Sequence, residues 1–272
     1  MTPVLRFTRI VFVVGVCLTA GTGVGLFAFP DRTADYWAWT IKAPLSASLF
    51  GAGYITAAVS LALAARERFW ERARIVAVVA FTLTSLALLA TLVSREPFAF
   101  GKGGLRELVA WIWLAVYVAL PPLLLVAFVR QERVDRRMPP ERPARPLTRL
   151  LLGALGLLFA VLGVLLVADW RELGDRWPWP LPTLPARVVG AWVATYAAGL
   201  LWFALRDHEW ARARIVALPG LILVVLNLVA ALRFRGDFHG TAATTLYIVG
   251  LAALAAAVVA AELLEVRRAA AR

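Results

Sequence analysis

Eight long apolar segments follow one another along this chain, separated by short polar breaks. They cover residues 10–29, 43–65, 74–93, 106–129, 149–168, 186–205, 214–232 and 241–261. About 20 apolar residues are enough for a helix to cross a hydrocarbon core roughly 30 Å thick. Hydrophobic residues make up 61% of the chain, well above the content of soluble domains. The sequence therefore predicts an all-α integral membrane protein with eight transmembrane helices and no separate aqueous domain.

The chain also contains an internal repeat. Residues 66–77 and 206–217 are nearly the same segment, and the same offset of 140 positions pairs Trp37 with Trp177 and Phe98 with Phe238. Each copy holds four predicted spans, and an even number of spans returns the chain to its starting side. We therefore expect two parallel four-helix repeats of the same orientation, related by a pseudo-twofold axis along the membrane normal. The expected units are residues 1–130 and 149–272, joined by an Arg/Pro-rich cytoplasmic linker at 131–148.

The basic residues predict the orientation in the membrane. The net charge is +12, but the Lys and Arg residues gather at the ends of the predicted spans, so they indicate topology and not a nucleic-acid partner. With the N-terminus inside, 19 of the 29 basic residues fall on the inner side. Both termini are therefore expected in the cytoplasm. The strong preference for Arg over Lys suggests a bacterial protein, and hence the bacterial cytoplasmic membrane.

The repeated basic segment lies at the inner membrane surface between the second and third span of each repeat. It consists of Arg66, Trp70, Arg72 and Arg74 in the first copy and of Arg206, Trp210, Arg212 and Arg214 in the second. One interpretation is a turn that sets topology and carries an interfacial Trp anchor. The other is a binding site for anionic lipid head groups, one per repeat.

The outer face is rich in tryptophan and aspartate. The residues that could form an outer pocket are Asp31, Asp35, Trp37, Trp39, Asp175, Trp177 and Trp179. An aromatic belt at the membrane interface explains the indoles without any ligand. The alternative is a pocket roofed by indoles and edged by carboxylates, which a membrane glycosyltransferase would use with one carboxylate as the base.

Few polar residues lie within the predicted spans, and ionisable groups are expected only at the span ends, which argues against ion pumping. Tyr54, Tyr196 and Asn227 form a candidate intramembrane polar site. Hydroxyl groups in a span commonly serve helix packing. The amide of Asn227 must find a partner. If the protein were a carrier, these residues would line a cavity between the repeats.

No cofactor or metal is expected. Cys17 is the only cysteine, and the two histidines, His208 and His239, fall on opposite sides of the predicted membrane.

The sequence leaves three functions open. The first is a non-catalytic scaffold or a lipid- or partner-binding subunit, with the bilayer, anionic inner-face lipids and other membrane subunits as partners. The second is a carrier for a neutral or amphipathic molecule between the repeats, and the third is the transferase.

Overall fold

The computed structural model describes residues 3–134, 143–168, 171–240 and 242–270. Within them, eight helices are long and apolar enough to cross a membrane. They are α1 (Arg6–Ala28), α3 (Pro44–Arg66), α4 (Trp70–Val93), α5 (Gly104–Glu132), α6 (Pro146–Val167), α8 (Thr183–Trp202, continued by the π-helix η2, Phe203–Asp207), α9 (Trp210–Arg233) and α10 (Ala242–Ala270). The prediction of an all-helical chain with eight helices long and apolar enough to span a membrane is confirmed for these residues, and it suggests a multi-pass membrane protein. Part of the predicted linker, residues 135–142, lies outside the described residues.

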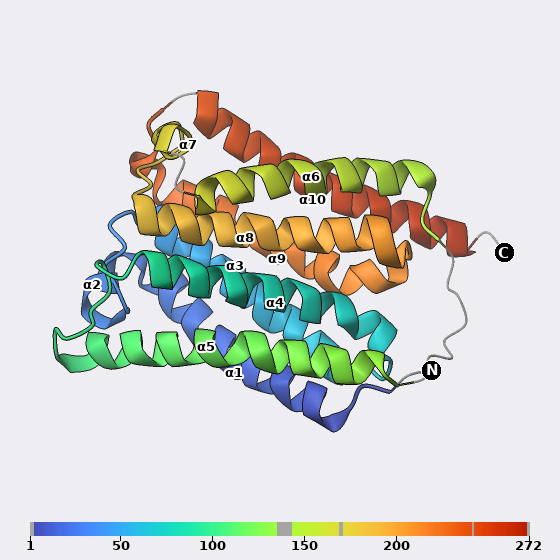
Figure 1. Ribbon diagram of the computed structural model, residues 1–272. Helices are drawn as coiled ribbons and strands as arrows, with labels where there is room; N and C mark the ends of the chain where they lie inside the picture. Colours follow the sequence, from blue (N-terminus) through green and yellow to red (C-terminus); the bar gives the residue numbers. More distant parts are fainter. Residues whose placement is uncertain (1–2, 135–142, 169–170, 241, 271–272) are drawn as a thin grey trace.

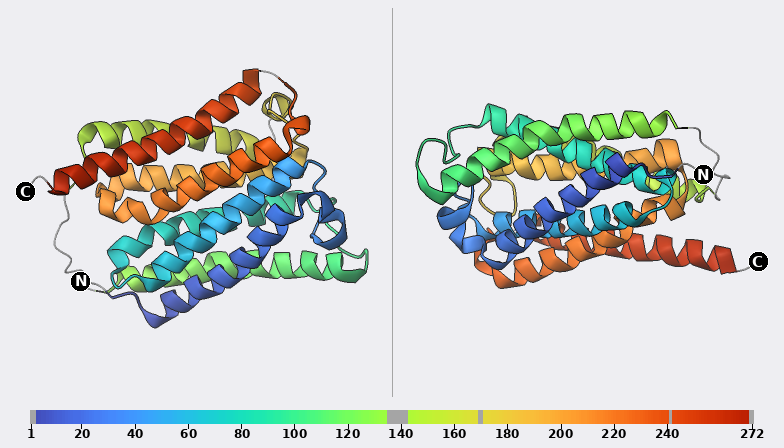
Figure 2. Two further views of the ribbon diagram at one scale, coloured as in Figure 1. Left: turned by 180° about the vertical axis from the view of Figure 1, so that it is seen from behind. Right: turned by 90° about the horizontal axis from the view of Figure 1, so that it is seen from below.

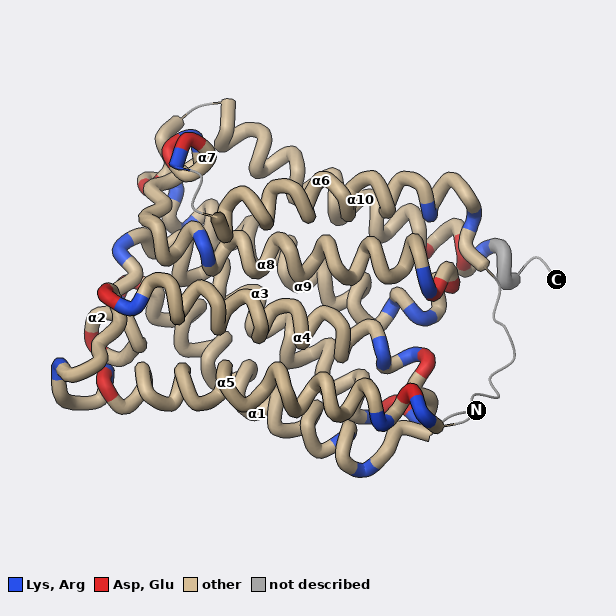
Figure 3. Tube along the Cα trace, in the orientation of Figure 1, with Lys and Arg blue, Asp and Glu red and all other residues tan. Residues whose placement is uncertain are grey.

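The long helices run side by side, and charged residues gather at their two ends (Figures 1 and 3). One end, where α1 begins and α10 finishes, is called the arginine-rich end below. The opposite end, called the tryptophan-rich end, carries the short elements. These are η1 (Pro30–Arg32), α2 (Thr33–Tyr36), α7 (Arg171–Asp175) and η3 (Arg235–Asp237). A helix of 23 residues, such as α1, is about 35 Å long, which is enough to span a bilayer.

The helices form two groups that meet along a seam. In residues 3–134, the first half, α1 packs along α3 and α5 packs on α4 and α1. In residues 143–270, the second half, α6 packs along α8 and α10 packs on α9. The seam is formed where α4 meets α8 and α9, and where α3 meets α9 (Figure 2). The four helices α3, α4, α8 and α9 therefore form the centre of the molecule.

Glycines allow the closest helix approach in each half. A Cβ atom on Gly51 of α3 would lie 2.9 Å from the carbonyl oxygen of Gly23 on α1. A Cβ atom on Gly190 of α8 would likewise lie 2.9 Å from the carbonyl oxygen of Gly163 on α6. Real side chains cannot be placed at such distances, so these crossings require glycine. Small residues that bring backbones together are a common basis of helix association in membranes.

Backbone hydrogen bonds outside the helices recur at matching positions in the two halves. The N–H of Val4 donates to the carbonyl of Arg68 (3.1 Å), and the N–H of Ala144 donates to that of His208 (2.6 Å). At the other end, the two bonds are Ala99 N–H to Ala38 C=O (2.8 Å) and His239 N–H to Pro178 C=O (2.9 Å). In both cases each partner of the second bond lies 140 positions after its counterpart in the first.

The π-helix η2 marks a local difference between the halves. Helix α8 begins at Thr183, which is 139 positions after Pro44, whereas α9 begins 140 positions after α4. The turn between them therefore contains one extra residue in the second half. The N–H of His208 bonds the carbonyl of Phe203, five residues earlier, so the extra residue is accommodated as a π-turn. His208 then takes a left-handed conformation, with φ 55°.

Candidate functional site: the central cavity

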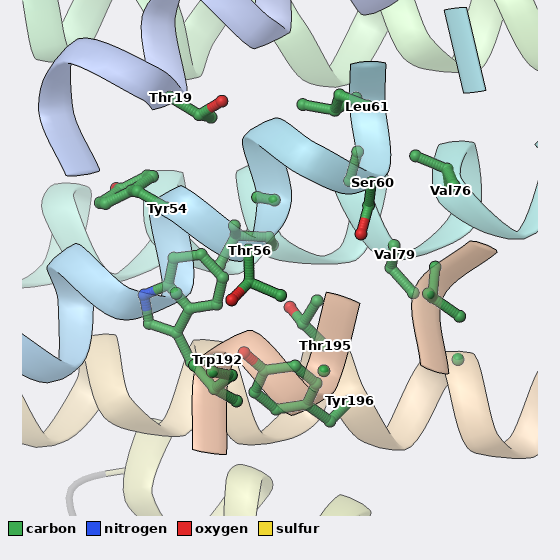
Figure 4. A pocket seen from close by; sticks show the side chains of 18 of the residues that line it. Thr19, Tyr54, Thr56, Ser60, Leu61, Val76, Val79, Trp192, Thr195 and Tyr196 are labelled. Atoms are coloured by element: carbon green, nitrogen blue, oxygen red, sulfur yellow. The ribbon is translucent and has the colours of Figure 1, made fainter. Parts of the chain in front are cut away.

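A cavity of about 280 Å³ lies along the seam, and residues from all eight spanning helices line it. Its centre is formed by residues of α3 and α8 near the middle of each helix, among them Tyr54, Thr56, Ser60, Thr195 and Tyr196 (Figure 4). The rest of the lining is mainly Leu, Val, Ile and Ala. Within the described residues the lining contains no Asp, Glu, Lys or Arg.

Aromatic side chains form a continuous row along one side of this cavity. The rings of Trp113 and Tyr117 on α5 lie 4.3 Å apart, and the Tyr117 hydroxyl lies 2.5 Å from that of Tyr54 on α3. The ring of Tyr54 meets Trp192 of α8 edge-on at 5.1 Å, and Trp192 stacks with Tyr196 at 6.4 Å. The row therefore crosses from the first half to the second and joins the halves through ring contacts.

The hydroxyl groups of the cavity differ in how they are satisfied. Thr84 and Thr195 return hydrogen bonds to their own helices, at Ala80 C=O (2.8 Å) and Ala191 C=O (2.7 Å). Thr56 is buried, and its hydroxyl has no partner. In the part of the chain that the structure describes, the hydroxyls of Ser60 and Tyr196 also make no hydrogen bond. Because most buried polar groups are paired, three unpaired hydroxyls beside one cavity indicate room for a polar group of a ligand or for water.

An uncharged, mostly apolar guest suits this lining. Burying an isolated charge in an apolar medium is very costly, and no side chain of opposite sign lines the cavity. A guest with a hydroxyl or carbonyl group could bond the free hydroxyls while its hydrocarbon part contacts the apolar walls. Of the three residues predicted as an intramembrane polar site, Tyr54 and Tyr196 line the cavity and Asn227 does not. The Asn227 amide donates to Leu223 C=O (2.8 Å) and accepts from the Tyr247 hydroxyl (3.1 Å), so it has the partners it was expected to need.

The two tryptophans of the repeated basic segment are buried. The indole N–H of Trp70 donates to Glu132 of α5 (2.7 Å), and that of Trp210 donates to Glu262 of α10 (2.7 Å). Each indole thus ties the start of one helix to the last helix of its own half. The basic residues of the segment divide by environment. Arg66, Arg206 and Arg214 are exposed, Arg72 is half-buried, and Arg74 and Arg212 are buried.

Buried charges meet at the arginine-rich end of the seam, in a cluster that was not among the residues predicted from the sequence. The Asp207 carboxylate pairs with Arg74 and accepts a hydrogen bond from the Trp202 indole (2.7 Å). Arg212 lies 3.5 Å from the same carboxylate and forms an ion pair with Glu209 at 2.7 Å. One signal for it was in the sequence: the repeat offset is 139 at Gly51 and Gly190 but 140 at Trp70 and Trp210, so the second half has one extra residue in the segment that contains Asp207.

The predicted outer pocket residues separate in the structure. Trp37, Trp39 and Trp179 are buried, and Trp177 is partly buried. The rings of Trp37 and Trp39 pack against each other at 5.7 Å and against Trp113, and Trp37 also lines the cavity. The three carboxylates are exposed, and none of them lines the cavity; these residues are Asp31, Asp35 and Asp175.

No group of three His, Cys, Asp or Glu side chains in the described residues is arranged to hold a metal ion. His208 lies at the arginine-rich end and His239 follows η3 at the other, so the two histidines are separated by the length of the bundle. The candidate site therefore consists of the apolar cavity with its hydroxyls, and of the ionic cluster at one end of the seam.

Comparisons with protein-family models, curated proteins and solved structures find no match to this chain.

Proposed function

We propose that this protein is a carrier, located in the bacterial cytoplasmic membrane, for a neutral and mainly apolar small molecule that binds in the central cavity. The observation that carries the proposal is the cavity on the seam, which has an uncharged lining and free hydroxyls near mid-depth. Among the three functions left open by the sequence, the carrier is the one that requires a cavity in this place. The cavity volume also approaches the range of small-molecule sites, about 300–1,000 Å³.

The proposal includes two parallel repeats with both termini in the cytoplasm. The backbone bonds that recur with an offset of 140 support the repeat, as do the glycine crossings Gly23–Gly51 and Gly163–Gly190. The excess of basic residues at the arginine-rich end supports the cytoplasmic side for that end. Parallel repeats can rock against each other about a central site, which gives the cavity a means of facing each side in turn.

Native mass spectrometry of gently solubilised protein tests the proposal. We expect a small, uncharged molecule to remain bound to the wild-type chain. Gly220 of α9 lines the cavity, and a Cβ atom added there meets nothing within 4 Å, so Gly220→Leu fills the cavity with little strain. This variant should lose most of the bound molecule. Gly250→Leu on α10, where the added Cβ also meets open space, is the matched control and should retain it, because Gly250 does not line the cavity.

The same experiment separates the carrier from the scaffold or lipid-binding subunit. A scaffold that recruits anionic lipid through its exposed arginines should retain that lipid in Gly220→Leu and lose it in Arg66→Ala or Arg206→Ala. If the wild type retained no neutral molecule, and both the wild type and Gly220→Leu retained anionic lipid, the carrier proposal would be contradicted. The transferase would require a carboxylate beside an indole in a pocket, and Asp31, Asp35 and Asp175 do not line the cavity.

A further inference from the structure

The ionic cluster at the arginine-rich end connects the two halves. Arg74 belongs to α4 of the first half, while Asp207, Arg212, Glu209 and Trp202 belong to the second. The Asp207 side chain is 1% exposed, and those of Arg74 and Arg212 are 9% and 10% exposed. The Arg74 guanidinium also lies over the Trp202 ring, 5.9 Å from its centre. Arg74 therefore reaches across the seam and contacts both an acid and an indole of the other half.

This cluster lies at one end of the cavity. Ile75 and Val76, which follow Arg74 on α4, line the cavity, and so does Ala213, which follows Arg212 on α9. Phe203, at the start of the π-helix that ends in Asp207, lines it as well. Arg74, Asp207 and Arg212 are thus each within about one helical turn of a residue that lines the cavity. The cluster therefore lies on the seam between the cavity and the arginine-rich end.

Within the described residues, the counterparts of Arg74 and Asp207 do not pair with each other across the seam. Glu67, which is 140 positions before Asp207, forms no ion pair within the described residues. Arg214, which is 140 positions after Arg74, pairs with Glu262 of α10 at 2.5 Å, inside the second half. The π-helix η2 distinguishes the two turns, since it ends in Asp207 and has no counterpart in the first half. Single π-turns of this kind are frequent at functional sites.

We propose that the cluster of Arg74, Asp207 and Arg212 is a one-sided latch, which holds the halves together at the arginine-rich end and closes the cavity toward that side. This inference rests on the proposed carrier function, because a bound molecule needs a way out. A buried ion pair suits such a latch. Its charges lose hydration when the halves close and regain it when they part, so the net free energy of opening is much smaller than the Coulomb attraction alone.

Access of a water-soluble thiol reagent to the cavity tests the latch. The reporter is Ala57→Cys, a cavity-lining position on α3, in a Cys17→Ser background that has no other cysteine. A membrane-impermeant methanethiosulfonate reagent without a net charge is applied to reconstituted vesicles, from the arginine-rich side or from the opposite side. We expect slow modification with the latch intact. Asp207→Asn or Arg74→Gln should accelerate modification about tenfold or more from the arginine-rich side alone.

The matched control is Glu262→Gln. Like Asp207, Glu262 pairs with an arginine, Arg214, and accepts a hydrogen bond from an indole, that of Trp210. Glu262 and both of its partners belong to the second half. This variant should leave the modification rate unchanged. Asp207→Glu, which keeps the charge, should also keep modification slow. The comparison of Asp207→Glu with Asp207→Asn shows whether the cavity opens because the carboxylate is lost or because any substitution at this position disturbs the structure.

Two outcomes would overturn the latch. Unchanged modification in both Asp207→Asn and Arg74→Gln would show that the cluster does not close the cavity. Equal acceleration from both sides would show a general loosening of the bundle. The reagent measures access to the cavity and mass spectrometry measures the bound molecule, so a failed latch is distinguishable from a failed carrier.

Discussion

Single side chains form hydrogen bonds with backbone groups at both ends of α1. Tyr36 of α2 is an example, because its hydroxyl lies 3.0 Å from the carbonyl oxygen of Gly25 and 3.1 Å from that of Phe29. Both carbonyls also accept a backbone N–H, Gly25 from Phe29 (3.0 Å) and Phe29 from Arg32 (3.2 Å), so the hydroxyl adds a second hydrogen bond to each at the end of α1. Gln131 has a comparable role at the other end, where its amide bonds the backbone of Pro3 and Leu5 and the hydroxyl of Thr8.

The hydroxyl of Tyr36 should give the protein a distinct alkaline titration. Burial, assisted by the nearby negative charge of Asp31, raises the pKa of Tyr36 from 10.0 to about 12. A raised pKa means that the folded state favours the neutral hydroxyl. The stabilising contribution is therefore complete below pH 10, and it is lost as the pH rises through about 12. The ultraviolet absorbance of tyrosinate, compared between wild type and Tyr36→Phe, isolates this group. A difference spectrum with its midpoint near pH 10 would contradict the half-buried position of the Tyr36 hydroxyl beside Asp31.

At the scale of helices, the apolar pattern determined much of the fold. The runs at 43–65 and 74–93 correspond to α3 and α4, because a long apolar segment has one way to satisfy its backbone in a bilayer. The pattern could not show which face of a helix is buried. Trp70 and Glu132 lie 62 positions apart, and only the packing of α4 on α5 makes them partners.

The candidate site was predictable only in part. Tyr54 and Tyr196 were recognisable as polar residues near the middle of apolar runs, and both line the cavity. Arg74 and Asp207 pair only because the two halves pack together along the seam. The repeat offset of 140 does not indicate which arginine of each copy lies at this seam. The π-turn η2 was visible as a change in that offset, since Gly51 matches Gly190 but Trp70 matches Trp210.

The crossing of α1 and α3 should be intolerant of any side chain at its centre. A Cβ atom on Gly23 would lie 2.7 Å from the backbone nitrogen of Ile55, so Gly23→Leu must push the helices apart. We expect a loss of stability of about 1–3 kcal/mol or more from overpacking. Gly21→Leu, two positions away on the same helix, meets nothing within 4 Å and should be tolerated. Thermal unfolding of the two purified variants, followed by tryptophan fluorescence, measures the difference, and equal melting temperatures would refute the close crossing.

At the scale of the whole molecule, polar contacts cross the seam at both ends of the apolar cavity. Near the tryptophan-rich end, the Trp179 indole donates to Ser46 of α3 (2.8 Å), and the backbone N–H of Leu45 donates to Asp237 (3.3 Å). At the arginine-rich end, Arg74 pairs with Asp207. Lipid tails are as apolar as the helices, so burial of apolar surface does not by itself hold the halves together in a membrane. Packing and these polar contacts must do so.

The two halves should therefore assemble even when the covalent connection is removed. If residues 1–138 and 139–272 are co-expressed as separate chains, with an affinity tag on the first alone, we expect the second to co-purify in about equal amount. Trp179→Phe and Asp207→Asn in the second chain each remove a seam contact at one end, and together they should lower the recovered fraction severalfold. Glu262→Gln, which lies within the second half, should leave recovery unchanged. If each half instead accumulated in the membrane and was purified alone, the contacts across the seam would be too weak to join the halves, which would contradict this expectation.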